Sequence, residues 1–112
     1  MTKKYTIGII GLGYVGLPLA IAFADHFNVV GFDINQLRVS NLNLGIDSTD
    51  EADLKLLQKA TENKLQLSSN LQDLAACTVY IVTVPTPITQ FKTPDLTYLI
   101  SASKMIGSLL NS

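Results

Sequence analysis

A glycine-rich turn between an apolar run and a helical pattern constrains the fold of this chain more than any other feature. The apolar run 5–10 leads into residues 11–16, GLGYVG, and a helical pattern then continues to about residue 26. A second apolar run, 28–32, ends on Asp33. This order of strand, glycine turn, helix, strand and acid is typical of a βαβ unit that binds a dinucleotide.

The three glycines of the turn meet separate physical requirements. Gly11 allows a sharp exit from the strand, Gly13 lets a pyrophosphate approach the backbone, and Gly16 allows the helix to pack closely on the strand. Free N–H groups and the positive end of the helix dipole can hold a phosphate without a basic side chain. Because no Lys or Arg lies between Lys4 and Arg38, backbone groups are the predicted phosphate ligands.

Asp33 is the predicted ligand of an adenosine ribose. It follows the first glycine at close to the spacing of roughly 20 residues that such an acid shows. Its carboxylate would accept hydrogen bonds from the two ribose hydroxyls and repel a 2′-phosphate, so NAD is expected rather than NADP. Arg38 would lie over the adenine or reach a phosphate. A solvated helix charge is the alternative for Arg38.

The N-terminal stretch also has two other interpretations. Lys3 and Lys4 precede a long uncharged run, 7–24, which resembles a signal peptide or a membrane span. Glycines and Pro18 within the run argue against both, and the strand that ends on an acid has no role in a signal. A glycine-rich turn of some other α/β protein is the remaining alternative.

Composition indicates one compact domain without metal chemistry. The chain has 112 residues, is 47% hydrophobic and 15% charged, and carries a net charge of −1. No basic patch favours nucleic acid. The single cysteine, Cys77, excludes an internal disulfide and favours a reducing compartment, hence a cytoplasmic location. One His and one Cys cannot form a metal cluster. Cys77 is interpreted as a buried filler rather than a nucleophile.

The rest of the chain predicts an α/β fold. Strands are expected at 5–10, 28–32, 65–67 and 78–84, and helices at 15–26, 36–44, 51–62, 71–76 and 96–110. Strand 78–84 is rich in β-branched residues, which is typical of a buried parallel strand. Asn35, Asn70 and Asp95 are expected helix caps, and a capping box is expected within 48–53. The expected architecture is a Rossmann-like doubly wound parallel sheet of about four strands, order 3-2-1-4, with helices on both faces.

The loop after strand 78–84 is the second predicted part of the site. Pro85 and Pro87 stiffen the exit from the strand. Loops at the carboxyl ends of strands near the reversal of strand order line the ligand crevice. Thr86 is therefore expected to offer its hydroxyl to a ribose or phosphate of the cofactor, and a plain turn is the alternative.

Three motifs together resemble one protein family. The segments GLGYVGLPLA, VVGFDIN and VTVPTPI are similar to the N-terminal NAD-binding domain of the nucleotide-sugar 6-dehydrogenases, the UDP-glucose/GDP-mannose dehydrogenase family. With KTPDLTYLI, they look most like the branch that acts on UDP-N-acetylhexosamines. The resemblance covers nearly the whole chain and is clearest at 5–38 and 79–100. Together with the reading of the residues, it predicts the NAD-binding set Gly11, Leu12, Gly13, Tyr14, Val15, Gly16, Asp33, Arg38, Pro85 and Thr86.

The resemblance implies an enzyme that oxidises the C6 alcohol of a UDP-N-acetylhexosamine or UDP-hexose to a carboxylate with two NAD, for polysaccharide synthesis. The family's catalytic Cys, catalytic Lys and sugar-binding residues lie in later domains, and nothing in this chain matches them. Residues 1–112 are thus expected to be the N-terminal NAD-binding fragment of a cytoplasmic homo-oligomer, inactive alone, without nucleic-acid or membrane partners. The alternatives are a free-standing dinucleotide-binding module and an NAD domain of another dehydrogenase class, such as a 6-phosphogluconate or 3-hydroxyacyl-CoA type.

Overall fold

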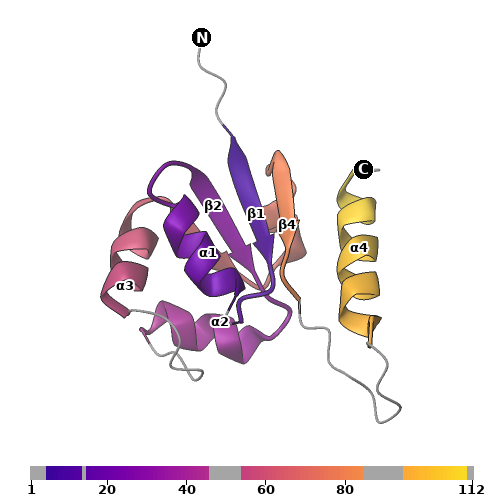
Figure 1. The fold of residues 1–112 in the computed structure, drawn as a ribbon, viewed down its shortest axis with the longest axis horizontal. Helices are drawn as coiled ribbons and strands as arrows, with labels where there is room; N and C mark the ends of the chain where they lie inside the picture. The colour runs from indigo at the N-terminus through magenta and orange to yellow at the C-terminus, as the bar shows by residue number, and fades with distance from the viewer. Residues whose placement is uncertain (1–4, 14, 46–53, 85–94, 111–112) are drawn as a thin grey trace.

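A computed structural model describes residues 5–13, 15–45, 54–84 and 95–110, and within them one parallel sheet has helices on both faces (Figure 1). The strands are β1 (Thr6–Ile10), β2 (Asn28–Phe32), β3 (Leu65–Ser68) and β4 (Val79–Val82). Their order is β3-β2-β1-β4, as predicted. The helices are α1 (Gly16–Phe23), α2 (Gln36–Asn43), α3 (Leu54–Asn63), the short 3₁₀ helix η1 (Leu71–Leu74) and α4 (Thr97–Leu110).

The strand register brings the segments of the predicted site to one edge of the sheet. Ile10 of β1 pairs with Phe32 of β2 on one side and with Val82 of β4 on the other. The three strands therefore end level with one another. The glycine turn after β1 and the residues after β2 and β4 leave the sheet side by side, so chemistry from three distant parts of the sequence can meet there.

Two hydrophobic clusters cover opposite faces of the sheet. Alternate residues of a strand point to opposite faces, and Ile9 joins the cluster formed with α1, α2 and α3 while Ile10 joins the cluster formed with η1 and α4. Leu17, Val39 and Leu57 are the buried contributions of α1, α2 and α3 to the first cluster. Helices on both faces of the sheet were predicted, and the structure confirms them.

Side-chain caps begin the helices where the sequence predicts them. The Asn35 side chain accepts a hydrogen bond from the Arg38 amide (3.1 Å), and Asn70 accepts one from the Gln72 amide (3.1 Å). Asp95 accepts one from the Thr97 amide (2.9 Å). Each cap satisfies an N–H that the first helical turn leaves without an intrahelical partner. The capping box expected within 48–53 lies outside the described residues.

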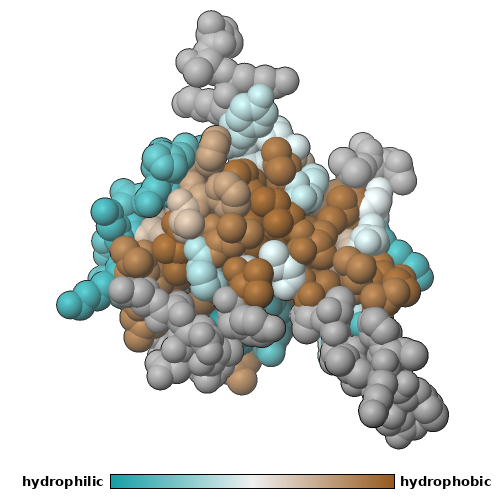
Figure 2. Space-filling model, viewed as in Figure 1, coloured by the Kyte–Doolittle hydropathy of each residue, from teal (hydrophilic) through white to brown (hydrophobic). Residues whose placement is uncertain are grey.

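Strand β4 differs from the prediction of a buried strand. It is shorter than 78–84, and Val79 is 39% exposed while the other three residues are half-buried. The strand is parallel, as predicted, but it lies at the edge of the described sheet, so one side of it has no neighbouring strand. Figure 2 shows hydrophobic side chains gathered on the side of the molecule where α1 and β4 lie.

Two of the predicted helices are also shorter in the structure. The helix expected at 15–26 ends at Phe23, and the one expected at 71–76 is a single 3₁₀ turn. In α4 the predicted apolar face is only partly covered. Ala102 is fully buried, but Leu99 is 37% exposed, because α4 packs on β4 and η1 through its later turns.

Candidate functional site

The glycine turn has a conformation that demands glycine at its first position. Gly11 has a φ of +104°, a region that L side chains rarely adopt, and a Cβ placed there would lie 2.9 Å from the Thr83 carbonyl oxygen. Its N–H donates to the Phe32 carbonyl (2.8 Å), which extends the pairing of β1 with β2 beyond the strand. The turn is therefore built into the sheet edge.

Gly13 and Gly16 have different surroundings. A Cβ on Gly16 would lie 1.8 Å from the Gly11 carbonyl oxygen and 2.3 Å from Thr83 Oγ1, so the close packing of α1 on the turn requires glycine. A Cβ on Gly13 would meet nothing within 4 Å. Close contacts with neighbouring atoms thus account for glycine at positions 11 and 16. The open space at Gly13 is what a group approaching the backbone from outside requires.

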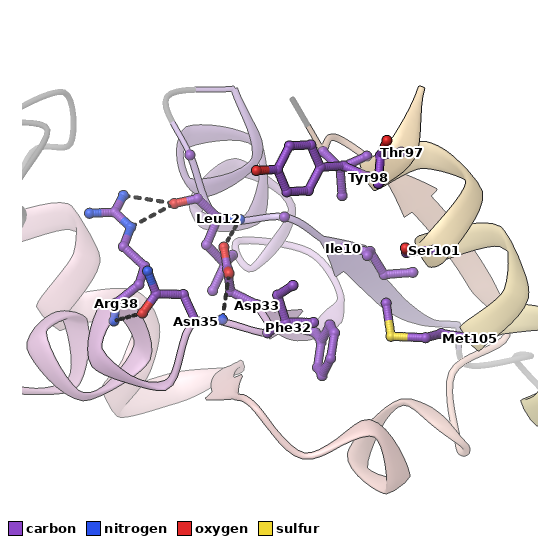
Figure 3. A pocket seen from close by; sticks show the side chains of 14 residues that line it. Ile10, Leu12, Phe32, Asp33, Asn35, Arg38, Thr97, Tyr98, Ser101 and Met105 are labelled. Carbon is purple, nitrogen blue, oxygen red and sulfur yellow. Dashed lines mark hydrogen bonds between the residues drawn. The ribbon is translucent and has the colours of Figure 1, made fainter. Parts of the chain in front are cut away.

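Asp33 lies directly against the turn. Its Oδ2 accepts a hydrogen bond from the Leu12 amide (2.9 Å), and its Oδ1 accepts one from the Asn35 amide (2.9 Å) (Figure 3). The side chain is half-buried. Because each carboxylate oxygen accepts more than one hydrogen bond, the two backbone contacts orient the group and leave acceptor capacity for a ligand hydroxyl.

Arg38 takes a position that the sequence did not predict. Its Nε and Nη2 donate to the carbonyl oxygen of Leu12 over 2.9 and 2.7 Å (Figure 3). Leu12 itself is fully buried, so its peptide groups are fixed by packing and by the two charged side chains, with Asp33 on its N–H and Arg38 on its carbonyl. The predicted contact of Arg38 with a cofactor stays a prediction. The contact with the turn is the finding.

Thr83 is a further residue that the sequence did not single out. Its Oγ1 lies 2.7 Å from the Gly11 carbonyl oxygen and 3.2 Å from that of Ile10, and its N–H donates to Ile10 over 2.8 Å. The hydroxyl holds the end of β4 to the start of the turn. The sequence signal was weak: a threonine near the end of an apolar strand, which β-propensity alone explains.

A cavity of about 510 Å³ opens beside the turn. Its walls come from the ends of β1 and β2, from the turn, from the residues that follow β2 and β4, and from α4. The lining residues are Ile10, Gly11, Leu12, Gly13, Phe32, Asp33, Ile34, Asn35, Arg38, Val84, Thr97, Tyr98, Ser101 and Met105. Five of the predicted NAD-binding residues line this cavity. The contribution of α4 was not predicted: helical periodicity singled out the apolar residues of this helix, and of the four α4 residues that line the cavity it had named Met105 alone.

The remaining predicted site residues have different outcomes. Gly16 lies behind the turn, where it packs against Gly11. Val15 is 53% exposed just before α1, and it is not among the residues that line the cavity. Tyr14, Pro85 and Thr86 lie outside the described residues, so their roles stay predictions.

The part of the chain that the structure describes also bears on metal binding, on membrane-spanning helices and on the chemistry of the single cysteine. Within it, no three His, Cys, Asp or Glu side chains gather as metal ligands would, and none of its helices has the length and apolarity needed to cross a bilayer. Cys77 is buried, and burial raises the pKa of its thiol. The sulfur lies under Gly8, as the predicted filler would, and a raised pKa disfavours the reactive thiolate.

Comparison with known proteins identifies relatives over nearly the whole chain. The model of the UDP-glucose/GDP-mannose dehydrogenase family, NAD binding domain, matches residues 5–112. A UDP-N-acetyl-D-glucosamine 6-dehydrogenase of Pseudomonas aeruginosa is 55% identical over 96% of this chain and 25% of its own length. The chain therefore spans about a quarter of that relative.

Solved structures show the same likeness. The UDP-D-ManNAc dehydrogenase of Pyrococcus horikoshii superposes with a TM-score of 0.86 at 34% identity, over 93% of this chain and 25% of that one. The (S)-3-hydroxybutyryl-CoA dehydrogenase of Ralstonia eutropha gives a TM-score of 0.54 at 26% identity, over 76% of this chain and 32% of that one. The likeness to a nucleotide-sugar dehydrogenase is thus the stronger of the two.

Proposed function

The chain belongs to the UDP-glucose/GDP-mannose dehydrogenase family, and we propose that residues 1–112 are the NAD-binding domain of a UDP-sugar 6-dehydrogenase. The proposed enzyme oxidises the C6 alcohol of a UDP-N-acetylhexosamine to a carboxylate. NAD supplies the hydride acceptor for both oxidation steps. This chain binds and orients that cofactor, while the catalytic and sugar-binding residues belong to other parts of the enzyme.

One observation carries the proposal: the open backbone of Gly13 and the carboxylate of Asp33 line the same cavity. A pyrophosphate at Gly13 would lie close to the start of α1, where the positive end of the helix dipole favours an anion. An adenosine ribose at Asp33 would meet a carboxylate that backbone contacts have already oriented. The pyrophosphate and the adenosine ribose are bonded to each other in a dinucleotide, so adjacent sites for the two groups fit one half of that cofactor.

The other proposed cofactor contacts rest on the family resemblance. Tyr14, Val15 and Pro85 are assigned to the NAD site on that ground, and Thr86 on that ground and on its place after β4, near the reversal of strand order. Arg38 is assigned both to the cofactor and to the turn, because its guanidinium lines the cavity while it holds the Leu12 carbonyl. A planar cation at this place can support an adenine face or a phosphate.

The cellular setting of the enzyme is part of the same proposal. A cytoplasmic location is supported by the single, buried cysteine. A role in polysaccharide synthesis follows from the uronic acid that such an oxidation produces. Homo-oligomerisation of the enzyme is proposed from the family resemblance, and residues 1–112 by themselves are expected to associate through the apolar edge at β4, where Val79 is 39% exposed.

Isothermal titration calorimetry of the chain with NAD and with NADP tests the proposal. We expect measurable binding of NAD and weaker binding of NADP, because the 2′-phosphate would approach the Asp33 carboxylate. Tighter binding of NADP than of NAD would contradict the assignment, and so would a chain that binds neither nucleotide. The much higher TM-score of the UDP-D-ManNAc dehydrogenase favours this class over the 3-hydroxyacyl-CoA type.

A further inference from the structure

We infer that Tyr98 of α4 is the residue that packs against the adenine ring of NAD, an assignment that rests on the proposed function. Tyr98 lines the cavity together with Thr97, Ser101 and Met105. Residues at this spacing share one side of a helix. Together they form the wall opposite the glycine turn and Asp33, and the proposed contacts with the phosphates and the ribose use none of them.

The shape of an adenosine determines which of its parts reaches this wall. Its ribose carries the hydroxyls on C2′ and C3′, the phosphates on C5′ and the base on C1′. If Asp33 accepts the hydroxyls and Gly13 receives the phosphates, the two polar walls are occupied. The base is then left facing the rest of the cavity, which is lined by Ile10, Phe32, Val84 and the α4 wall.

Tyr98 is suited to receive a flat base. Its side chain extends from α4 toward the part of the cavity where Leu12 and Asp33 lie (Figure 3). It remains 45% exposed, so packing within the chain leaves much of the ring uncovered. Stacking of a base on such a ring is a sequence-tolerant interaction that depends on the ring rather than on a hydrogen bond.

Nuclear magnetic resonance of the chain with NAD tests the contact directly. We expect nuclear Overhauser effects between the H2 and H8 protons of adenine and the ring protons of Tyr98. The chain has four tyrosines, and the spectrum of Tyr98→Phe assigns the signal. Effects from the adenine protons to a different tyrosine, or from the nicotinamide protons to Tyr98, would overturn the inference.

Calorimetry supplies a second, independent readout. Tyr98→Ala should raise the Kd for NAD about tenfold, and the Kd for ADP-ribose, which contains the same adenosine, by the same factor. Tyr98→Phe keeps the ring and should bind both as the wild type does. Ile100→Ala is the matched control, because Ile100 is on the same helix, 51% exposed and outside the cavity lining.

The outcomes distinguish failure of the proposed NAD-binding function from failure of the Tyr98 assignment. A wild-type chain that binds neither NAD nor ADP-ribose would overturn the proposed function and this inference together. If the wild type binds NAD and Tyr98→Ala binds it equally well, the inference alone is wrong. An equal loss in Tyr98→Phe and Tyr98→Ala would assign the contact to the hydroxyl, and the stacking role would be wrong.

Discussion

Arg38 donates two hydrogen bonds, of 2.9 and 2.7 Å, to the carbonyl oxygen of Leu12. The residues are far apart in the sequence, one within the glycine turn and the other in the first turn of α2. Asp33 accepts the N–H of the same leucine. A cation and an anion therefore hold the two polar groups of one turn residue, so the turn has its shape before a ligand arrives.

Substitution of Arg38 tests this arrangement. Arg38→Ala should lower the free energy of unfolding by about 1–2 kcal/mol, because the Leu12 carbonyl loses a charged donor at a half-buried position. The free energy of unfolding of Arg38→Lys should lie between those of the wild type and Arg38→Ala, since an ammonium group cannot present the parallel N–H pair of a guanidinium. Urea denaturation measures both variants. Equal stability of all three proteins would show that the contact contributes nothing.

Asp33→Asn should weaken NAD binding by about 1–2 kcal/mol, because charge-assisted hydrogen bonds to the ribose are lost. Both carboxylate oxygens accept backbone N–H groups, so the amide nitrogen of an asparagine would also face a donor. Calorimetry with NAD measures the change. Asp25→Asn is the control, because Asp25 is an exposed acid after the far end of α1. An unchanged Kd in Asp33→Asn would remove Asp33 from the site.

Alanine substitutions of the two glycines should have different effects: Gly16→Ala should lower stability, and Gly13→Ala should weaken NAD binding. Gly16→Ala places a Cβ 1.8 Å from a carbonyl oxygen, so it should lower the free energy of unfolding by about 3 kcal/mol, as overpacking does. Gly13→Ala meets nothing within 4 Å and should fold as the wild type does, but its methyl group would block the approach of a pyrophosphate. Thermal unfolding and NAD titration of both variants measure the two effects. Full NAD affinity in Gly13→Ala would place the phosphate elsewhere.

Thr83→Val should cost about 1 kcal/mol of stability, because the hydrogen bond from Oγ1 to Gly11 is lost at a half-buried site. Thr83→Ser keeps the hydroxyl and should recover most of the loss. Chemical denaturation compares the two variants with the wild type. A Val variant as stable as the wild type would mean that the hydroxyl contributes little to the join between β4 and the turn.

Stability should fall as the pH rises above the pKa of an unfolded thiol, about 8.5. Burial raises the pKa of Cys77 in the folded chain, so above that pH the unfolded state binds fewer protons and is favoured. Tyr80 contributes in the same direction at higher pH, since burial raises its pKa too. Urea denaturation between about pH 7 and about pH 9.5 should show that the free energy of unfolding declines less steeply with pH in Cys77→Ala than in the wild type. Identical slopes would exclude the thiol as the cause.

The sequence by itself determined the local structure and the topology. The apolar runs, the glycine spacing and the caps at Asn35, Asn70 and Asp95 specify where elements begin, because these signals act over a few residues. The parallel order β3-β2-β1-β4 follows once strands alternate with helices and the connections are right-handed. Gly11, Gly13 and Asp33 could be placed at one site for the same reason.

Only the tertiary structure decided which distant groups touch. The contacts of Arg38 with Leu12 and of Thr83 with Gly11 join separate elements, and the cavity wall formed by Tyr98 depends on how α4 packs on η1 and β4. Such contacts depend on side-chain direction and helix placement, which the packing of the whole core sets. Hydrophobic periodicity shows which face of a helix is apolar. It does not show which apolar residues are buried in the core and which line a cavity.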